Sequence, residues 1–244
     1  MNIYGKTDPG LKRSQNQDVY KTCKISDNLS WIMVCDGMGG AKAGDVASRK
    51  AAEIIETELT SKLKEDITAD DIKVIVNNAI EIANTEIYRL SCDTEDYRGM
   101  GTTVVISIVL NNKLYTAHVG DSRAYLWDGN SCKQITVDHS LVQALINAGK
   151  LDSESARLHP QKTIITKCLG VRESVRCDFS IYDFPTGDCV VLCSDGLGDY
   201  LNQESITEFF SYYQEEYVVE ALIDFAMRCG GTDNISVAAI FNNK

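Results

Sequence analysis

The stretch Trp31-Ile-Met-Val-Cys-Asp36-Gly-Met-Gly-Gly40 is the part of the sequence that decides the fold. Five apolar residues run into a carboxylate, and a glycine-rich turn follows. Apolar runs of this length that end in turn residues are typical of buried strands. We therefore expect Asp36 at the end of a core strand, where Gly37, Gly39 and Gly40 let the backbone turn sharply and present its peptide groups to whatever the carboxylate binds.

The same construction recurs at Cys189-Val-Val-Leu-Cys-Ser-Asp195-Gly196, and a third acidic turn, Gly231-Thr-Asp233-Asn234, precedes the apolar run 235–241. A single Asp-Gly pair usually marks only a turn, but three such units at strand ends predict a carboxylate metal site. Hard oxygen ligands of this kind select magnesium or manganese rather than zinc or copper. The aspartates that stand beside glycine or at a strand end are Asp18, Asp36, Asp121, Asp195 and Asp233.

Length and composition predict one ordinary globular domain, 1–244, around a single core. A net charge of −11 argues against nucleic acid or an anionic membrane as the partner. The start of the sequence has no basic segment followed by an apolar one, and no stretch approaches the roughly 18 apolar residues of a membrane span, so neither a signal peptide nor a membrane segment is expected. The nine scattered cysteines indicate free thiols, several of them in the core, and therefore a reducing compartment, the cytoplasm.

Apolar residues at helical spacing predict two long helices, 43–63 and 68–90, which form an antiparallel pair. Strands are expected in residues 1–10, 19–24, the block 103–136, 175–183, 188–194 and 235–241, with further helices at 202–210 and 214–228. Asp138 is expected to cap a short helix that ends at Gly149, and residues 150–174, which lack a clean period, to form a surface flap. Strands in clusters with helix pairs between them favour an α+β fold of antiparallel sheets packed on each other, with helices outside.

Eight motifs follow one another along nearly the whole chain: Arg13…Asn16-Gln-Asp18, Val34-Cys-Asp36-Gly-Met-Gly-Gly40, Gly99-Met-Gly-Thr-Thr103, Val119-Gly-Asp121-Ser-Arg-Ala-Tyr125, Asp138-His-Ser140, His159-Pro160, Cys193-Ser-Asp195-Gly-Leu197 and Gly231-Thr-Asp-Asn234. In this order they strongly resemble the metal-dependent protein phosphatases of type 2C, and most of all their compact bacterial serine/threonine members. An ordered set of this length is far more specific than any single motif. The resemblance implies a four-layer α-β-β-α fold, a central antiparallel β-sandwich flanked by helix pairs, with a dinuclear Mn²⁺ or Mg²⁺ centre in a cleft at one end.

The resemblance also implies a role for each candidate ligand. Asp36 would bridge both ions, Asp195 and Asp233 would bind the first, and the Gly37 carbonyl would bind the second. Asp18 would serve the second ion through water.

Two further residues take roles by the same resemblance. Asp121, together with Asp195, matches the family's weaker third-metal position, and Arg13 would hold the substrate phosphate.

The implied activity is hydrolysis of phosphoserine and phosphothreonine in proteins, by in-line attack of a metal-bridging hydroxide. Two metal ions about 4 Å apart lower the pKa of a shared water, and a planar guanidinium such as Arg13 can grip two phosphate oxygens at once. No cysteine or serine nucleophile is needed, so the residues expected to carry catalysis are Arg13 and Asp36. Met38 stands where some members of the family have a histidine that is a candidate general acid. Bacterial relatives share this methionine, which leaves the acid unassigned.

Two other functions remain open on the sequence: a hydrolase of small phosphate esters, and a catalytically weak member that binds phosphoproteins. The intact set Asp36, Asp195 and Asp233 argues against the second. The expected partners are phosphoproteins and a serine/threonine kinase whose phosphorylation the enzyme reverses, and the expected state is a monomer. His139 is expected to be structural or to anchor the flap, and His118 to be packed in a strand.

Overall fold

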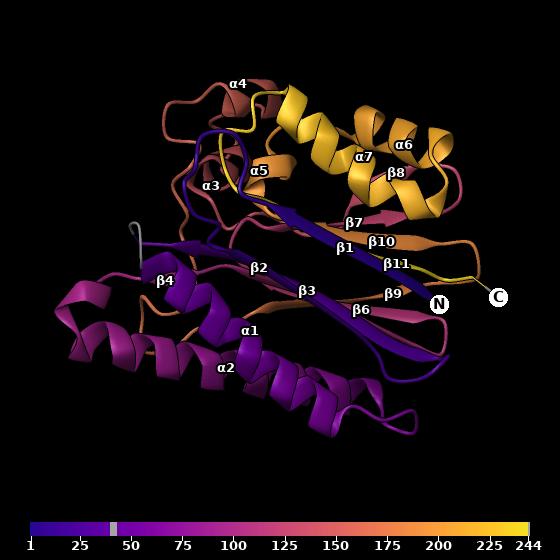
Figure 1. Cartoon of the computed structure of the whole chain (residues 1–244), viewed down its shortest axis with the longest axis horizontal. Coiled ribbons are helices and arrows are strands. Elements are labelled where there is room, and N and C mark those ends of the chain that lie inside the picture. The colour runs from indigo at the N-terminus through magenta and orange to yellow at the C-terminus, as the bar shows by residue number, and fades with distance from the viewer. Residues whose placement is uncertain (40–42, 244) are drawn as a thin grey trace.

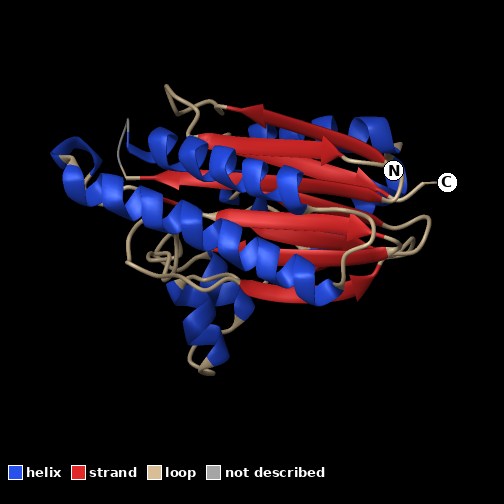
Figure 2. Cartoon of the chain, turned by 90° about the horizontal axis from the view of Figure 1, so that it is seen from below, coloured by secondary structure: helices blue, strands red, loops and turns tan. Residues whose placement is uncertain are grey.

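A computed structural model describes residues 1–39 and 43–243, so Gly40 of the central turn lies outside the described residues. The chain forms two antiparallel sheets that stack face to face (Figures 1 and 2). The first sheet has the order β1-β11-β10-β7-β8, and the second the order β2-β3-β5-β6-β9, with the two-residue strand β4 paired to β3. The strands are β1 (Asn2–Asp8), β2 (Asp18–Lys24), β3 (Leu29–Met38), β4 (Gly101–Thr102), β5 (Val104–Leu110), β6 (Lys113–Val119), β7 (Arg123–Trp127), β8 (Cys132–Gln134), β9 (Asp178–Asp183), β10 (Cys189–Cys193) and β11 (Ile235–Phe241).

Strand β3 is apolar along its length because it is covered on both faces. Trp31, Met33 and Cys35 pack into the core beneath the first helix pair, whereas Ile32 and Val34 point the other way into the core between the sheets. This alternation is the two-residue period of a strand with no solvent-exposed face.

Helices form the two outer layers. The antiparallel pair α1 (Ala43–Lys62) and α2 (Ala69–Asp93) covers the second sheet, and α6 (Gln203–Tyr212) and α7 (Glu215–Arg228) cover the first (Figure 1). Helix α2 begins where the sequence predicts, with a reciprocal capping box between Thr68 and Asp71. The predicted fold class, α+β with a central antiparallel sandwich flanked by helix pairs, is confirmed.

Several local features differ from the sequence prediction. The short helices η1 (Glu95–Tyr97), α4 (Ser153–Arg157) and α5 (Asp195–Gly198) lie in segments where no helix was predicted. Helix α3 (Leu141–Asn147) is capped by the Ser140 hydroxyl, which accepts a hydrogen bond from the Gln143 amide, and not by Asp138. The prediction for Asp138 was wrong because its carboxylate is drawn into a bidentate pair with Arg123, a contact between segments that no local pattern reveals.

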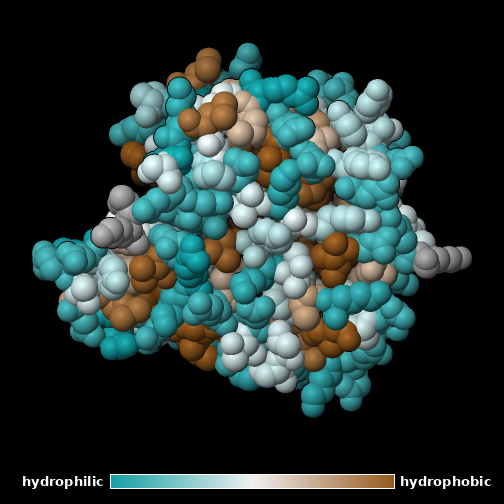
Figure 3. All heavy atoms as spheres, in the orientation of Figure 1, coloured by the Kyte–Doolittle hydropathy of each residue, from teal (hydrophilic) through white to brown (hydrophobic). Residues whose placement is uncertain are grey.

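In the part of the chain that the structure describes, no helix is both long and apolar enough to cross a membrane. On the face drawn in Figure 3, apolar side chains form separate spots among hydrophilic ones. Scattered apolar residues of this kind are normal on a protein surface.

Candidate metal centre

All five predicted aspartates lie at one end of the sandwich, and strand pairing explains why. Asp18 opens β2 and is paired in register with Asp36 at the end of β3. Asp121 follows the end of β6, Asp195 follows the end of β10, and Asp233 precedes β11. Because each strand is antiparallel to its neighbours, these ends meet at the same edge of the sheets. The prediction that distant segments deliver their carboxylates to one place therefore agrees with the topology.

The backbone at Asp36 is fixed by the Gly-Thr-Thr motif. The Thr103 amide and the Thr102 hydroxyl both donate to the Asp36 carbonyl, at 2.9 Å each, and the Asp36 amide donates to the Thr103 hydroxyl at 3.0 Å. The Thr103 hydroxyl also lies 2.7 Å from that of Ser122, next to Asp121. These threonines were predicted only as part of a motif, and in the structure they tie the Asp36 end of β3 to the segment that carries Asp121.

Gly37 follows Asp36 at a point where two backbones nearly touch. A Cβ at this position would lie 2.2 Å from the Gly44 carbonyl oxygen, so only glycine lets the first residues of α1 approach the end of β3. This close packing fixes the position of the Gly37 peptide group, which directly follows Asp36.

Asp18 is held by a residue from the opposite sheet. The Ser194 hydroxyl donates to Asp18 Oδ2 at 2.6 Å and accepts the Ser236 amide at 3.0 Å. The other oxygen, Asp18 Oδ1, is buried and has no hydrogen-bond partner, and the same is true of Asp121 Oδ1. A buried carboxylate oxygen without a donor is costly in free energy, so these two oxygens call for a cation. Ser194 was not predicted as a site residue, although it directly precedes Asp195 in the motif.

The carboxylates of the centre repel one another. Burial first, and then neighbouring carboxylates, raise the pKa of Asp36 and of Asp18. Burial and neighbouring carboxylates raise the pKa of Asp121 and that of Asp195 in the same way. Buried carboxylates in such mutual repulsion ionise readily only when a positive charge joins them. The unpaired oxygens, the excess negative charge and the all-oxygen donor set therefore fit Mn²⁺ or Mg²⁺.

Arg13 and Asp233 lie at the rim of the centre. Arg13 Nη2 donates to Asp233 Oδ2 at 2.6 Å, and about half of the arginine side chain is exposed. The neighbouring Asn234 accepts the Gln17 amide and donates to the Pro9 and Gln15 carbonyls, so it pins the loop that carries Arg13. Sequence reasoning quoted Asn234 in a motif but gave it no such role.

The cysteines beside the centre are inert. Cys35 and Cys193 are fully buried, and burial raises the pKa of both thiols, that of Cys193 to about 12. A thiol with a raised pKa is a poor nucleophile at neutral pH. The expectation that neither cysteine attacks phosphate agrees with this burial.

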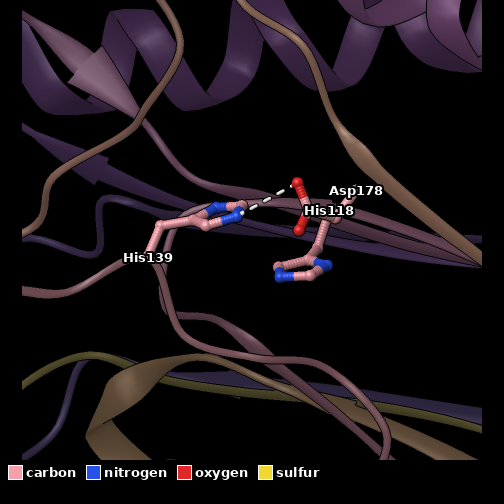
Figure 4. A group of neighbouring side chains, drawn as sticks. All are labelled: His118, His139 and Asp178. Atoms are coloured by element: carbon pink, nitrogen blue, oxygen red, sulfur yellow. Dashed lines mark ion pairs between the residues drawn. The ribbon is translucent and has the colours of Figure 1, made fainter. Parts of the chain in front are cut away.

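A second group of side chains has the residue types of a metal site. His118, His139 and Asp178 offer ligand atoms within 4.8 Å of one another (Figure 4). His139 Nδ1, however, accepts the Gly120 amide at 3.0 Å, so the ring proton is on Nε2, which faces Asp178 Oδ1 at 3.3 Å. A neutral imidazole has one lone pair, and a histidine that binds a metal donates its other ring N–H. His139 therefore has no lone pair left for a metal.

The other two residues of this group also have partners in the fold. His118 Nε2 donates to the Val137 carbonyl at 2.9 Å, and its ring stacks on that of His139 with 4.6 Å between centroids. Asp178 Oδ1 also accepts Lys167 Nζ at 2.9 Å. The Thr166 amide donates to the His139 carbonyl, so His139 is structural and anchors the flap, as expected.

Fold and donor set together define a class, that of metal-dependent phosphatases built on an α-β-β-α sandwich. The sequence profile of the family described as protein phosphatase 2C matches residues 12–225. The chain belongs to this family. The family assignment confirms the predicted class of enzyme, a metal-dependent serine/threonine protein phosphatase.

Individual relatives agree with the assignment. The protein phosphatase PhpP of Streptococcus pneumoniae serotype 2 (strain D39) is 36% identical over 245 residues, which cover 100% of this chain and 98% of that protein. The structure of the S. agalactiae serine/threonine phosphatase superposes with a TM-score of 0.90 at 34% identity, and the match covers 98% of both chains. The catalytic domain of the serine/threonine protein phosphatase PstP, solved in complex with two manganese ions, gives a TM-score of 0.82 at 30% identity and covers 98% of this chain and 96% of that one.

Proposed function

We propose that the chain hydrolyses phosphoserine and phosphothreonine in proteins with two Mn²⁺ or Mg²⁺ ions in the aspartate centre. One observation carries the proposal: the centre is a set of buried and half-buried carboxylates that repel one another, and in it the buried oxygens Asp18 Oδ1 and Asp121 Oδ1 have no donor. Bound divalent ions would lower the pKa of water and stabilise charge on the transferring phosphoryl group. The manganese-bound relative supports this choice of cofactor.

The proposed ligands divide between the ions as the resemblance implies. Asp36 would bridge them, Asp195 and Asp233 would hold the first, and the Gly37 carbonyl would hold the second. Asp18 would serve the second ion through water, and its Oδ1, which has no donor in the fold, could accept a hydrogen bond from that water.

Asp121 would serve a weaker third ion together with Asp195. The buried, unpaired Oδ1 of Asp121 supports this assignment. Met38 ends β3 two residues after Asp36 and has no proton to donate, so no residue of the chain is assigned as general acid.

Arg13 would bind the substrate phosphate. Its guanidinium is half exposed at the rim of the centre, and a second oxyanion could share the donors that Asp233 does not use. When Asp233 binds a metal ion, more of the guanidinium would be released to the substrate.

The test is phosphate release from a phosphothreonine peptide in Mn²⁺, in chelator, and with the variant Asp195→Ala in Mn²⁺. We expect turnover that is abolished by the chelator and by the variant. The matched control is Asp183→Ala, which removes an exposed carboxylate of β9 and should keep full activity. Metal binding without turnover of any phosphopeptide would favour the phosphoprotein-binding alternative, and turnover of small esters alone would favour the small-ester hydrolase.

The cellular setting is also a proposal. We infer a cytoplasmic monomer that reverses the action of a serine/threonine kinase. Pull-downs with the substrate-trapping Asp195→Ala variant would test this, and recovery of no phosphoprotein would count against it.

The single domain 1–244 would carry a flap at about 150–174 that selects substrates. The flap lies between the Asp121 and Asp195 segments, and the amide of its Thr166 is anchored to the His139 carbonyl. Grafting a different flap without any change in phosphopeptide preference would refute this role.

A further inference from the structure

A cavity of about 470 Å³ lies between His139 and the segment 165–176. Three basic side chains, Lys167, Arg172 and Arg176, line it, and no carboxylate does. Every lining residue that carries a full charge is therefore basic, although the chain as a whole has a net charge of −11. We call this cavity the arginine pocket.

Two of the three positive charges in the arginine pocket are free. Lys167 is neutralised by Asp178 at 2.9 Å. In the described part of the chain, 1–39 and 43–243, neither Arg172 nor Arg176 forms an ion pair, and both side chains belong to exposed residues. Free guanidinium groups bind carboxylate and phosphate oxygens through paired N–H donors.

A second cavity, about 630 Å³ in volume and lined in part by Asp121 of the centre, is different. Its Arg123 is paired with Asp138, and its Lys162 with Asp199 at 2.7 Å. Its Arg157 donates to the Leu201 carbonyl. Of the four basic groups of that cavity, only the exposed Lys133 forms no such contact among the described residues, whereas two of the three basic groups of the arginine pocket are unpaired.

The backbone of the arginine pocket is held rigidly. Asn84 of α2 is fully buried and donates to the carbonyls of Arg172 and Glu173, at 3.1 and 3.2 Å. The same side chain accepts the Gly170 amide at 2.9 Å. A buried amide that uses its oxygen and its nitrogen to hold three backbone groups of one loop pre-organises the side chains of that loop.

The arginine pocket adjoins the metal centre. Leu169 exchanges backbone hydrogen bonds with Thr102, at 2.9 and 3.1 Å, and Thr102 is paired with Gly37. Two strand spacings, about 10 Å, thus separate Gly37 from Leu169, which follows the lining residue Cys168. An extended peptide advances about 3.3 Å per residue, so the pocket lies about three to five residues from a phosphoryl group at the centre.

We propose that the arginine pocket binds an acidic side chain of the substrate phosphoprotein, three to five residues away from the phosphorylated serine or threonine. The ligand is an anionic group, either the carboxylate of Asp or Glu or a second phosphate. The proposal rests on the proposed function, because it concerns the substrates of the same centre.

The test compares the double variant Arg172→Ala/Arg176→Ala with the control Lys64→Ala/Arg228→Ala, which removes the same charge from exposed positions on α7 and in the α1–α2 loop. The substrates are four: a phosphothreonine peptide with neutral flanks, the same peptide with glutamates, the same peptide with one further phosphoserine, and para-nitrophenyl phosphate. We expect wild type and control to prefer an anionic peptide by about tenfold in kcat/KM, mainly through KM. The double variant should lose this preference and retain its turnover of the small ester.

Two outcomes would overturn the proposal. An equal loss in both double variants would mean long-range electrostatics rather than a pocket, and equal kcat/KM for all peptides in the wild type would mean that no subsite exists. The variant Arg172→Glu gives a second test, since it should reverse the preference toward a peptide with lysine flanks. A preference for phosphoserine over glutamate, or the reverse, identifies the anion. Failure of the proposed function is distinguishable, because the wild type would then release phosphate from none of the three phosphopeptides in Mn²⁺.

Discussion

The aspartate centre and the histidine group of Figure 4 both consist of residue types that bind metals, but they differ in whether their polar atoms already have partners in the protein. In the centre, Asp18 Oδ1 and Asp121 Oδ1 are buried without a donor, and the carboxylates repel one another. In the histidine group, His139 Nδ1 and Nε2 are both engaged by the protein. The difference teaches that a metal site is recognised by unsatisfied lone pairs and uncompensated charge, and not by residue types within reach of one another.

The largest effect is expected from removing a carboxylate of the centre. Asp36→Asn should lower kcat/KM for a phosphothreonine peptide by at least about a thousandfold, because the residue that would bridge both ions is lost. Asp178→Asn, the matched change in the histidine group, should leave most of the activity. Phosphate release in Mn²⁺ measures both, and equal losses in the two variants would erase the distinction between the groups.

Metal binding should separate the two groups directly. At Mn²⁺ a hundredfold above its dissociation constant, the free energy of unfolding should rise by about 2.7 kcal/mol for each tightly bound ion. Asp195→Asn should remove most of this gain, while His139→Gln should keep it. Calorimetric titration counts the ions in each variant. Fewer Mn²⁺ ions in His139→Gln than in the wild type would show that the histidine group does bind metal.

The two groups should respond to pH in opposite directions. In metal-free protein the folded-state pKa values of the buried aspartates are raised, so the folded state binds more protons than the unfolded state, and stability falls as pH rises above about 4. Burial lowers the pKa of His118 and His139, so the unfolded state binds more protons there, and stability falls as pH drops below about 6.5.

Urea unfolding in chelator at several pH values measures both slopes, each pKa unit being worth about 1.4 kcal/mol. Asp195→Asn should reduce only the loss of stability that the aspartates cause as pH rises above about 4. Mn²⁺ should turn this loss into a gain. If the free energy of unfolding changed with rising pH in the same way in chelator and in Mn²⁺, this would contradict a metal centre at the aspartates.

A smaller effect is expected from His139 alone. His139→Phe keeps a ring to stack on His118 but leaves the buried Gly120 amide without its acceptor, at a cost of about 1–3 kcal/mol in the free energy of unfolding. His159→Phe is the matched control, since His159 Nδ1 accepts the Gln161 amide in an exposed turn where water can replace it. The control should change stability by less than about 0.5 kcal/mol. Equal costs would show that burial of the acceptor does not matter.

The sequence by itself determined the elements whose signal is local. The apolar run before Asp36 predicts a strand buried on both faces, and the capping residue Thr68 with the helical spacing behind it predicts α2, because such signals are complete within a dozen or so residues. The motifs also named all five aspartates of the centre, since each stands at the end of its own strand. What they could not give is which oxygens lack a partner, because that depends on every neighbour at once.

Only the tertiary structure decided the remaining features, which all join segments far apart in the chain. Ser194 reaches Asp18 across 176 residues, and Asn84 fixes Arg172 across 88. Asp138 does not cap the helix, because its carboxylate forms a bidentate ion pair with Arg123, which is a stronger interaction than a cap. Ser140 caps the helix instead. A residue's type and local pattern limit what it can do, but its partners come from sheet pairing between distant strands, and that pairing is set by the packing of the whole chain.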